Sequence, residues 1–301
     1  MNPIDKARVR SAFSRGARAY DAHAPVQKHV VAQMALLASS EIALRRRPQA
    51  LGEDAPPAPW APPRVLDVGS GTGALLRLLS GKLHPALAVG VDLSPAMCRT
   101  ARSSPSPARF LTGDAEALPF RDGAFDLVIS TSTFQWLPRL DEAIAEARRV
   151  LVPGGLFCLA LFCGNTLHEL RGAFREALAN HRLLEDDRTH RFHSPSEVRA
   201  ALVRGGLRVK RISTEERVSH HPDARGVLES LRTIGAGNAA PRAGTGLGGR
   251  RVLLEMMRLY TERHGGESGV PATYQICYAV AARDETVPPR VAPSGPPQGT
   301  P

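Results

Sequence analysis

The chain has 301 residues, of which 43% are apolar and 23% are charged. This composition is ordinary for a globular protein, and it excludes a wholly disordered chain, a collagen-like repeat and a small disulfide-rich protein. The net charge of +10 comes mainly from arginine, because only four of the 39 basic residues are lysines. Such a charge indicates either an acidic partner or a plain compositional bias, and the scattered arginines leave both open.

Neither a membrane span nor a secretory signal is predicted. The sequence contains no apolar run of about 18 residues, and its first ten residues are charged without an apolar stretch. The four cysteines form no C-x-x-C pair and no zinc-finger spacing with histidine. We therefore expect a cytoplasmic protein with reduced thiols and no bound metal.

The chain begins with a helical segment that is followed by a proline-rich break. Residues 5–44 carry apolar residues at helical spacing, among them Val30 and Met34. Residues 46–63 are so rich in proline that they cannot form a helix or a central strand. We predict that residues 1–45 form an N-terminal helical lid and that the break is a flexible linker to the main domain.

From Arg64 onward, strands and helices alternate, which predicts an α/β domain with a parallel sheet and helices on both faces. The first five strands are expected at 64–68, 87–92, 110–112, 125–130 and 156–162, with helices at 74–83, 95–103 and 140–150. Later helices are expected at 166–184, 196–204, 224–234 and 250–263, and strands at 207–218 and 273–282. The proline-rich tail, residues 285–301, is predicted to be disordered.

The strongest local signal is a glycine turn between the first strand and its helix. The sequence Asp67-Val-Gly69-Ser-Gly71-Thr-Gly73 combines an acidic residue with three glycines. Glycine permits positive φ and lets a ligand approach the backbone closely, and the following helix start offers unpaired N–H groups. Taken alone, the turn fits either a dinucleotide or S-adenosylmethionine (AdoMet).

Residues at the ends of the next strands favour AdoMet. Asp92 ends the second strand, where its carboxylate can accept hydrogen bonds from both ribose hydroxyls. Asp114 follows the third strand and can accept from the adenine amino group, while Ala115 covers the ring. The predicted cofactor-binding residues are Asp67, Gly69, Gly71, Gly73, Asp92, Leu93, Asp114, Ala115 and Ser130.

This ordered set of motifs resembles the class I AdoMet-dependent methyltransferases over about residues 64–163, and it does not resemble a dehydrogenase. The resemblance implies a Rossmann-like fold, with a mostly parallel seven-stranded sheet whose last strand is antiparallel. The domain would span residues 64–284, with helical inserts at about 164–204 and 222–264.

Residues 130–137 follow the fourth strand and should face the methyl acceptor, because ligands bind at the carboxyl ends of the strands in this fold. The segment offers hydroxyls, an amide and an aromatic ring, but no basic side chain. The chain also lacks the N/D-P-P-Y/F motif and the Pro-Cys nucleophile. These absences disfavour methylation of exocyclic amines in DNA and of C5 in pyrimidines.

Four further segments carry a family signature: F-x-R-x-A-x-x-Y-D-x-x-A-x-x-Q at 13–27, F-Q-W at 134–136, L-x-x-I-G-A-x-N at 231–238 and T-Y-Q-I at 273–276. Together they resemble the BioC family, the malonyl-acyl-carrier-protein O-methyltransferases of biotin synthesis. The resemblance implies AdoMet-dependent methyl transfer to the free carboxylate of a malonyl thioester on acyl-carrier protein. The product would be the methyl ester that begins pimeloyl synthesis.

The expected chemistry needs alignment of the reactants more than proton transfer, because a malonyl carboxylate is already ionised at pH 7. The resemblance points to Tyr20, Gln135 and Trp136 as the catalytic residues.

A basic surface would attract the acidic carrier, and no nucleic acid partner is expected. Malonyl-CoA as an acceptor stays open, as does the oligomeric state. The alternatives are a methyltransferase for another small molecule or RNA, and a non-methylating AdoMet-fold protein such as the arginine-hydroxylating assembly factors of respiratory complex I.

Overall fold

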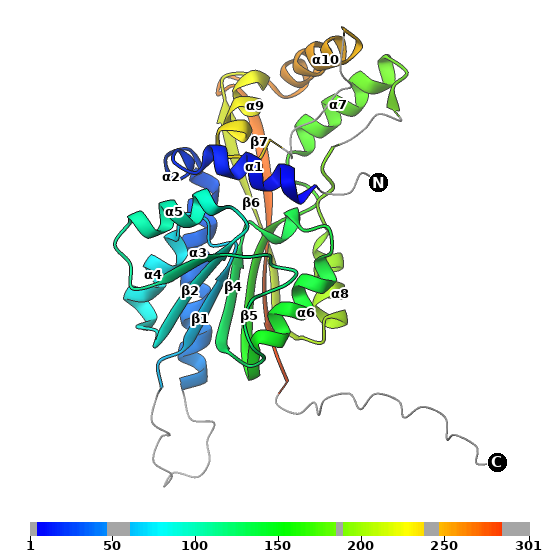
Figure 1. Cartoon of the computed structure of the whole chain (residues 1–301). Coiled ribbons are helices and arrows are strands. Elements are labelled where there is room, and N and C mark those ends of the chain that lie inside the picture. The colour runs from blue at the N-terminus through cyan, green and yellow to red at the C-terminus, as the bar shows by residue number, and fades with distance from the viewer. Residues whose placement is uncertain (1–4, 47–60, 185–188, 238–246, 285–301) are drawn as a thin grey trace, which may run out of the picture.

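The computed structural model describes residues 5–46, 61–184, 189–237 and 247–284, so the predicted tail and most of the predicted linker lie outside the described residues. Its centre is a seven-stranded sheet in the order β3-β2-β1-β4-β5-β7-β6 (Figure 1). The strands are β1 (Arg64–Val68), β2 (Leu87–Asp92), β3 (Arg109–Thr112), β4 (Phe125–Thr131), β5 (Leu151–Phe162), β6 (Arg208–His221) and β7 (Val270–Ala282). The first five are parallel and β7 is antiparallel to both neighbours, which confirms the predicted Rossmann-like fold.

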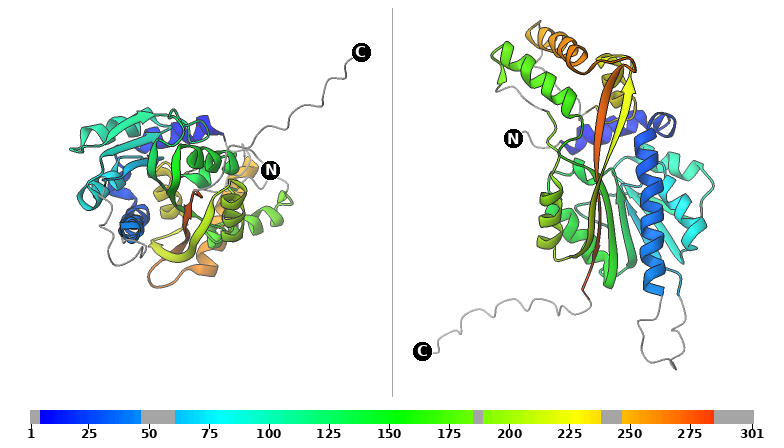
Figure 2. Two further views of the ribbon diagram at one scale, coloured as in Figure 1. Left: turned by 90° about the horizontal axis from the view of Figure 1, so that it is seen from below. Right: turned by 180° about the vertical axis from the view of Figure 1, so that it is seen from behind.

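Helices cover both faces of the sheet (Figures 1 and 2). The helices that follow β1 in the chain are α4 (Ala74–Leu83), α5 (Pro95–Ser103), α6 (Leu140–Val150), α7 (His168–Asn180), α8 (Pro195–Arg204), α9 (Ala224–Thr233) and α10 (Leu247–His264). The strands β1, β2 and β4 are almost continuously buried, as expected when both faces of a parallel sheet are covered. Within the described ranges, no helix combines the length and the apolarity needed to cross a membrane.

The structure divides the predicted N-terminal lid into three helices, α1 (Lys6–Gly16), α2 (Tyr20–His23) and α3 (Pro25–Arg46). A proline in a helix interior removes a hydrogen bond, so Pro25 begins a new helix instead of extending α2. Helix α3 packs against α4 and the sheet, and its Val30 and Met34 are fully buried. Only α1 and α2 therefore lie over the carboxyl edge of the sheet, while α3 belongs to the core.

The helices of the two predicted inserts lie in two different parts of the molecule. Strands β6 and β7 extend beyond the other strands and carry α7, α9 and α10 at one end of the molecule (Figure 1). Helix α8 instead packs against α6 on a face of the sheet. Strand β5 begins five residues earlier than predicted, at Leu151, with a register irregularity against β4.

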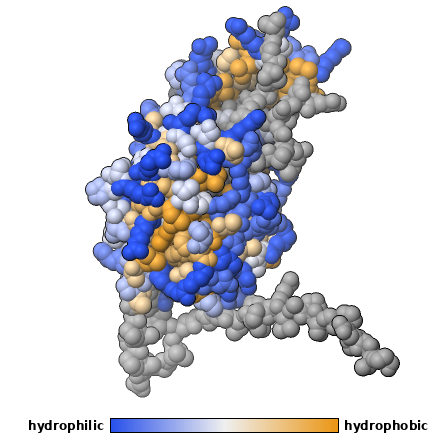
Figure 3. Space-filling model, viewed as in Figure 1, coloured by the Kyte–Doolittle hydropathy of each residue, from blue (hydrophilic) through white to orange (hydrophobic). Residues whose placement is uncertain are grey.

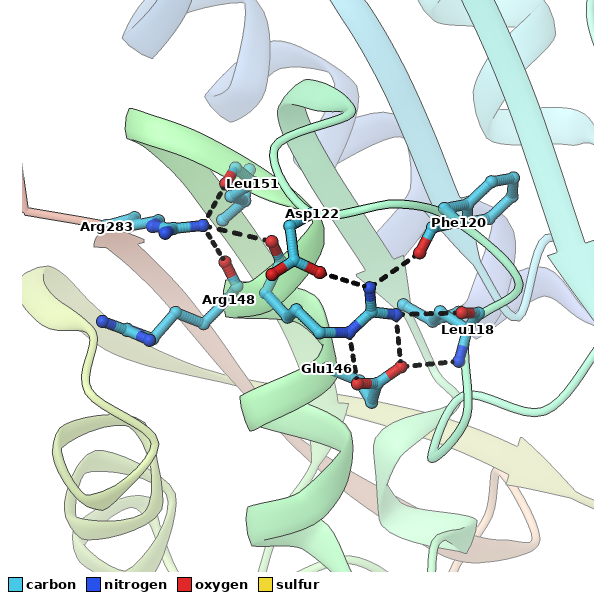
Figure 4. A network of polar contacts seen from close by, with 8 residues as sticks. Leu118, Phe120, Asp122, Glu146, Arg148, Leu151 and Arg283 are labelled. Atoms are coloured by element: carbon cyan, nitrogen blue, oxygen red, sulfur yellow. Dashed lines mark hydrogen bonds and ion pairs between the residues drawn. The ribbon is translucent and has the colours of Figure 1, made fainter. Parts of the chain in front are cut away.

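An arginine network attaches the loop after β3 to α6 (Figure 4). The guanidinium of Arg149 donates to both carboxylate oxygens of Glu146, at 2.6 and 2.8 Å. It also donates to the carbonyl oxygens of Leu118 at 2.9 Å and Phe120 at 2.7 Å, and to Asp122 at 2.8 Å. Because the same loop carries the predicted adenine-binding residues, this network holds one wall of the candidate site.

The loop of residues 113–124, between β3 and β4, contains no helix. Apolar residues gather over the strands on the face shown in Figure 3. Leu87, Leu111 and Phe120 are among the partly buried residues that pack against the core cluster that includes residues of strands β1, β2 and β4 and of α6.

Candidate active site

Hydrogen bonds to β2 fix the backbone conformation of the glycine turn after β1. The backbone N–H of Gly69 donates to the carbonyl of Val91 at 2.7 Å, and that of Gly71 donates to Oδ2 of Asp92 at 2.9 Å. Gly71 has φ +53°, and a Cβ built on it would meet no atom within 4 Å. The turn is therefore open at Gly71, where a ligand can approach the backbone.

A cavity of about 760 Å³, its open mouth included, lies beside the turn and is called the cofactor cavity here. Six of the nine predicted cofactor-binding residues line it: Gly69, Gly71, Asp92, Leu93, Asp114 and Ala115. Helix α1 supplies the opposite wall through Lys6, Val9, Arg10 and Phe13. The structure thus brings together strand ends that are far apart in the sequence.

The other three predicted residues lie outside this cavity. Ser130 is fully buried and its hydroxyl donates to the carbonyl of Val68 at 2.6 Å. Because side chains alternate along a strand, the next residue, Thr131, lines the cavity instead. A Cβ on Gly73 would lie 2.6 Å from the Phe110 ring, so Gly73 serves packing at the start of α4.

Asp67 lies behind the turn, where it lines a rear cavity of about 930 Å³ that also borders Gly71. Its Oδ1 atom and the hydroxyl of Ser70 are buried without a hydrogen-bond partner in the described part of the chain. Burial and the nearby charge of Asp92 raise the pKa of Asp67 to about 8. Asp67 is therefore an unsatisfied acceptor at the site, and a cationic ligand group would stabilise its ionised form.

Helix α1 is attached to the site by polar contacts that the sequence analysis missed. Lys6 donates to Oδ2 of Asp114 at 2.6 Å and also pairs with Glu116. Burial acts to raise the pKa of Asp114, but the Lys6 ammonium and its hydrogen bond hold that pKa below its usual value. The hydroxyls of Ser14 and Ser94 are hydrogen-bonded at 2.8 Å. No sequence motif indicated these contacts, because they join segments 80 or more residues apart.

A second cavity of about 380 Å³, called the inner chamber here, contains all three predicted catalytic residues in its wall: Tyr20, Gln135 and Trp136. None of the described residues that line it is charged. Tyr20 and Ser132 line both the inner chamber and the cofactor cavity, so they lie where the two spaces meet.

The backbone of Ser132 is in the left-handed region with φ +54°, which is uncommon for a residue with a side chain. Its N–H donates to the carbonyl of Ala160 at 2.8 Å, and its own carbonyl accepts from Nε2 of Gln135 at 3.0 Å. The second amide atom of Gln135, Oε1, is buried without a partner among the described residues. The turn after β4 therefore offers the chamber the hydroxyl of Ser132 as a donor and the unpaired Oε1 of Gln135 as an acceptor.

Aromatic rings enclose the junction of the two spaces. Trp136 lies with its ring centroid 5.9 Å from that of Phe13 and 4.8 Å from that of His190. Burial, together with the charges of Asp92 and Asp21, raises the pKa of Tyr20 well above its usual value. Tyr20 thus remains a protonated hydrogen-bond donor throughout the neutral pH range.

Comparison with known proteins agrees with this geometry. Residues 66–159 match a family model described as a methyltransferase domain. The chain is 48% identical to a malonyl-[acyl-carrier protein] O-methyltransferase of Geobacter sulfurreducens, over 93% of this chain and 100% of that protein. It is 34% identical to the protein of the same name from Laribacter hongkongensis, over 95% and 92%. The chain belongs to the malonyl-[acyl-carrier protein] O-methyltransferase family. Membership of this family makes AdoMet its cofactor.

Solved structures show the same fold with little sequence identity. A chain of the complex between the Haloferax volcanii Trm112 activator and a methyltransferase aligns with TM-score 0.53 and 22% identity, covering 93% of this chain and 99% of that one. A Bacillus halodurans methyltransferase aligns with TM-score 0.55 and 15% identity, covering 82% and 98%. These structural similarities support the class I methyltransferase fold of this malonyl-[acyl-carrier protein] O-methyltransferase family member.

Proposed function

We propose that the protein transfers the methyl group of AdoMet to the free carboxylate of a malonyl thioester on acyl-carrier protein. The observation that carries this proposal is the shared wall at Tyr20 and Ser132, where the cofactor cavity meets an uncharged inner chamber. The relatives are named for methyl transfer to malonyl-acyl-carrier protein, which supports this acceptor. The inner chamber would hold the acceptor beside the cofactor cavity.

The residues around the cofactor cavity fit AdoMet. Asp92 would bind the ribose and Asp114 the adenine amino group, while the backbone at Gly71 allows close approach. The unpartnered Oδ1 of Asp67 is a suitable acceptor for the ammonium of the methionine part. When bound, AdoMet supplies a methyl group that its sulfonium activates toward nucleophiles.

The inner chamber suits a carboxylate acceptor that needs no general base, since that carboxylate is ionised at neutral pH. Tyr20 and Ser132 would donate hydrogen bonds that orient the acceptor toward the cofactor cavity. The described side chains that line the chamber are neutral, so none of them would form an ion pair that stabilises the ground state of the carboxylate. Phe13 and Trp136 limit the access of water, which favours a reaction that neutralises opposite charges.

The proposal is tested by incubating the protein with labelled AdoMet and malonyl-acyl-carrier protein. We expect label on the carrier as a methyl ester that mild alkaline hydrolysis releases. The matched control is acetyl-acyl-carrier protein, which has the same thioester without the terminal carboxylate and should remain unlabelled. Methylation of the acetyl form, or of RNA in place of the malonyl carrier, would contradict the proposal.

The assignment of Asp67 predicts that cofactor binding releases a proton. With a pKa of about 8, Asp67 is mostly protonated at pH 7 in the free protein. Pairing with an ammonium lowers that pKa, so binding at pH 7 should release close to one proton from this group. Calorimetric titration in buffers of different ionisation enthalpy measures the release. Asp67→Asn should abolish this contribution and weaken binding, whereas unchanged proton release in the variant would exclude the role.

A further inference from the structure

The roof of the inner chamber is built by two helices that are far apart in the sequence. Phe13 from α1 and Leu231 and Ile234 from the α9 region line the chamber from this side. Helix α9 packs against α1 and α2, as Figure 1 shows. A Cβ added to Gly16 would lie only 2.8 Å from the carbonyl oxygen of Thr233, so the two helices are in close contact.

The outer face of this roof carries exposed arginines. Arg15 lies in the last turn of α1 and Arg18 just beyond its C-terminal cap, and Arg225 and Arg232 lie two turns apart on α9. No ion pair to a carboxylate is recorded for any of these four among the described residues, and Arg15 donates only to the hydroxyl of Ser11. The exposed acids of α9 are Glu229 and the N-cap residue Asp223, whose carboxylate accepts from the backbone N–H of Gly226 at 2.8 Å, so the four arginines outnumber the acids and leave this face positive.

The nearest acid of α2 does not neutralise the arginines of this face, because it is directed elsewhere. Asp21 accepts a hydrogen bond from the hydroxyl of Thr72 at 2.7 Å and lies 3.7 Å from the guanidinium of Arg77. Both partners belong to the glycine turn and α4. The guanidinium groups on the outer face are therefore available to a partner in solution.

We propose that the outer face of α1 and α9, called the basic roof, is the docking surface for acyl-carrier protein; this rests on the proposed function. The partner is acidic and carries its acyl group on a phosphopantetheine arm, so carboxylates and a phosphate would meet guanidinium groups that bind both. The acyl end is needed in the chamber directly beneath this face. A single exposed ion pair contributes little to the free energy of binding. The basic roof would therefore act through the combined electrostatic attraction of its arginines and by orienting the carrier.

The geometry favours a carrier protein over a nucleic acid. Binding of single strands uses exposed aromatic rings on which bases stack. The aromatic residues nearest to the basic roof, Phe13 and Tyr20, instead line the two cavities beneath it. The arginines lie on the helices that roof a small chamber whose described lining residues are uncharged, which suits a slender acyl arm.

The test is a triple charge reversal, Arg15→Glu, Arg18→Glu and Arg232→Glu, none of which lines either cavity. Titration of the phosphopantetheinylated carrier at two ionic strengths should show at least about tenfold weaker binding, with a smaller dependence on salt. AdoMet affinity and melting temperature should stay close to those of the wild type. The same three positions changed to Gln provide a gentler variant, which should bind about threefold more weakly.

The matched control reverses Arg109, Arg199 and Arg211, which are also exposed and change the net charge equally. They lie on β3, α8 and β6, and the two strand residues are near the amino ends of their strands, opposite the site. Carrier binding should stay within about twofold of the wild type. Equal losses in the two triple variants, or no loss in the first, would overturn the basic roof. If the wild type binds the carrier through this face but does not methylate its malonyl form, the proposed function fails while the docking surface stands.

Discussion

Deleting residues 1–23, which removes α1 and α2, is expected to abolish methyl transfer and to weaken AdoMet binding. These helices provide one wall of the cofactor cavity through Lys6 and Phe13, and Tyr20 at its junction with the inner chamber. Turnover of malonyl-acyl-carrier protein should fall at least about a hundredfold, equivalent to about 2.7 kcal/mol of transition-state stabilisation. AdoMet affinity, measured by calorimetry, should fall about tenfold because the contact of Lys6 with Asp114 is lost.

The control for this deletion is a longer one that also removes α3. Val30, Met34 and Ala38 of α3 are fully buried, and Glu41 pairs with Lys210 of β6 at 2.7 Å. The protein without residues 1–46 should therefore fail to fold, whereas the shorter deletion should retain a cooperative melting transition. Full activity after the shorter deletion would show that α1 and α2 are not part of the active site.

Replacing Tyr20 with Phe is expected to lower turnover at least about tenfold, or about 1.4 kcal/mol, with little change in AdoMet affinity. The substitution removes one hydroxyl from the junction of the two cavities and keeps the ring that packs near Phe13. Because burial keeps this phenol protonated, the wild-type side chain can donate to the acceptor at all neutral pH values. Steady-state methylation and calorimetry separate the two effects.

Tyr274→Phe is the matched control for this substitution. Tyr274 also lines the inner chamber, but it is more deeply buried than Tyr20 and does not line the cofactor cavity. Its replacement should change turnover less than about threefold. If both variants lose the same activity, the effect reflects packing of the chamber. Wild-type turnover in Tyr20→Phe would remove Tyr20 from the proposed catalytic residues.

The order of strands and helices and the position of the glycine turn could be predicted from the sequence because both depend on local patterns. Apolar runs between turn residues mark the strands, and only glycine adopts the backbone at Gly69 and Gly71 without strain. Asp92 and Asp114 were predicted at the site for a related reason, since the carboxyl ends of parallel strands meet along one edge.

Only the tertiary structure decided which neighbouring side chain faces the site. Ser130 and Thr131 are both polar residues at the end of β4, and the pleat of the strand directs Ser130 into the core and Thr131 to the cavity. Ser132 lies at the junction of both cavities because its left-handed backbone turns the chain after β4. The sequence placed Ser132 in the segment 130–137 that should face the acceptor, but a serine has no intrinsic preference for a left-handed backbone, so the sequence did not single out Ser132 within that segment.

The division of the N-terminal segment likewise depended on contacts that the sequence does not display. Helical spacing of apolar residues marks α1 and α3 alike, but periodicity does not reveal what an apolar stripe packs against. Helix α3 packs on α4 and the sheet, whereas α1 lies between α5 and α9 and reaches Asp114 through Lys6. Local chemistry thus determined the fold class and the cofactor turn of this protein. The enclosing wall of the site was decided by packing between segments that are far apart in the chain.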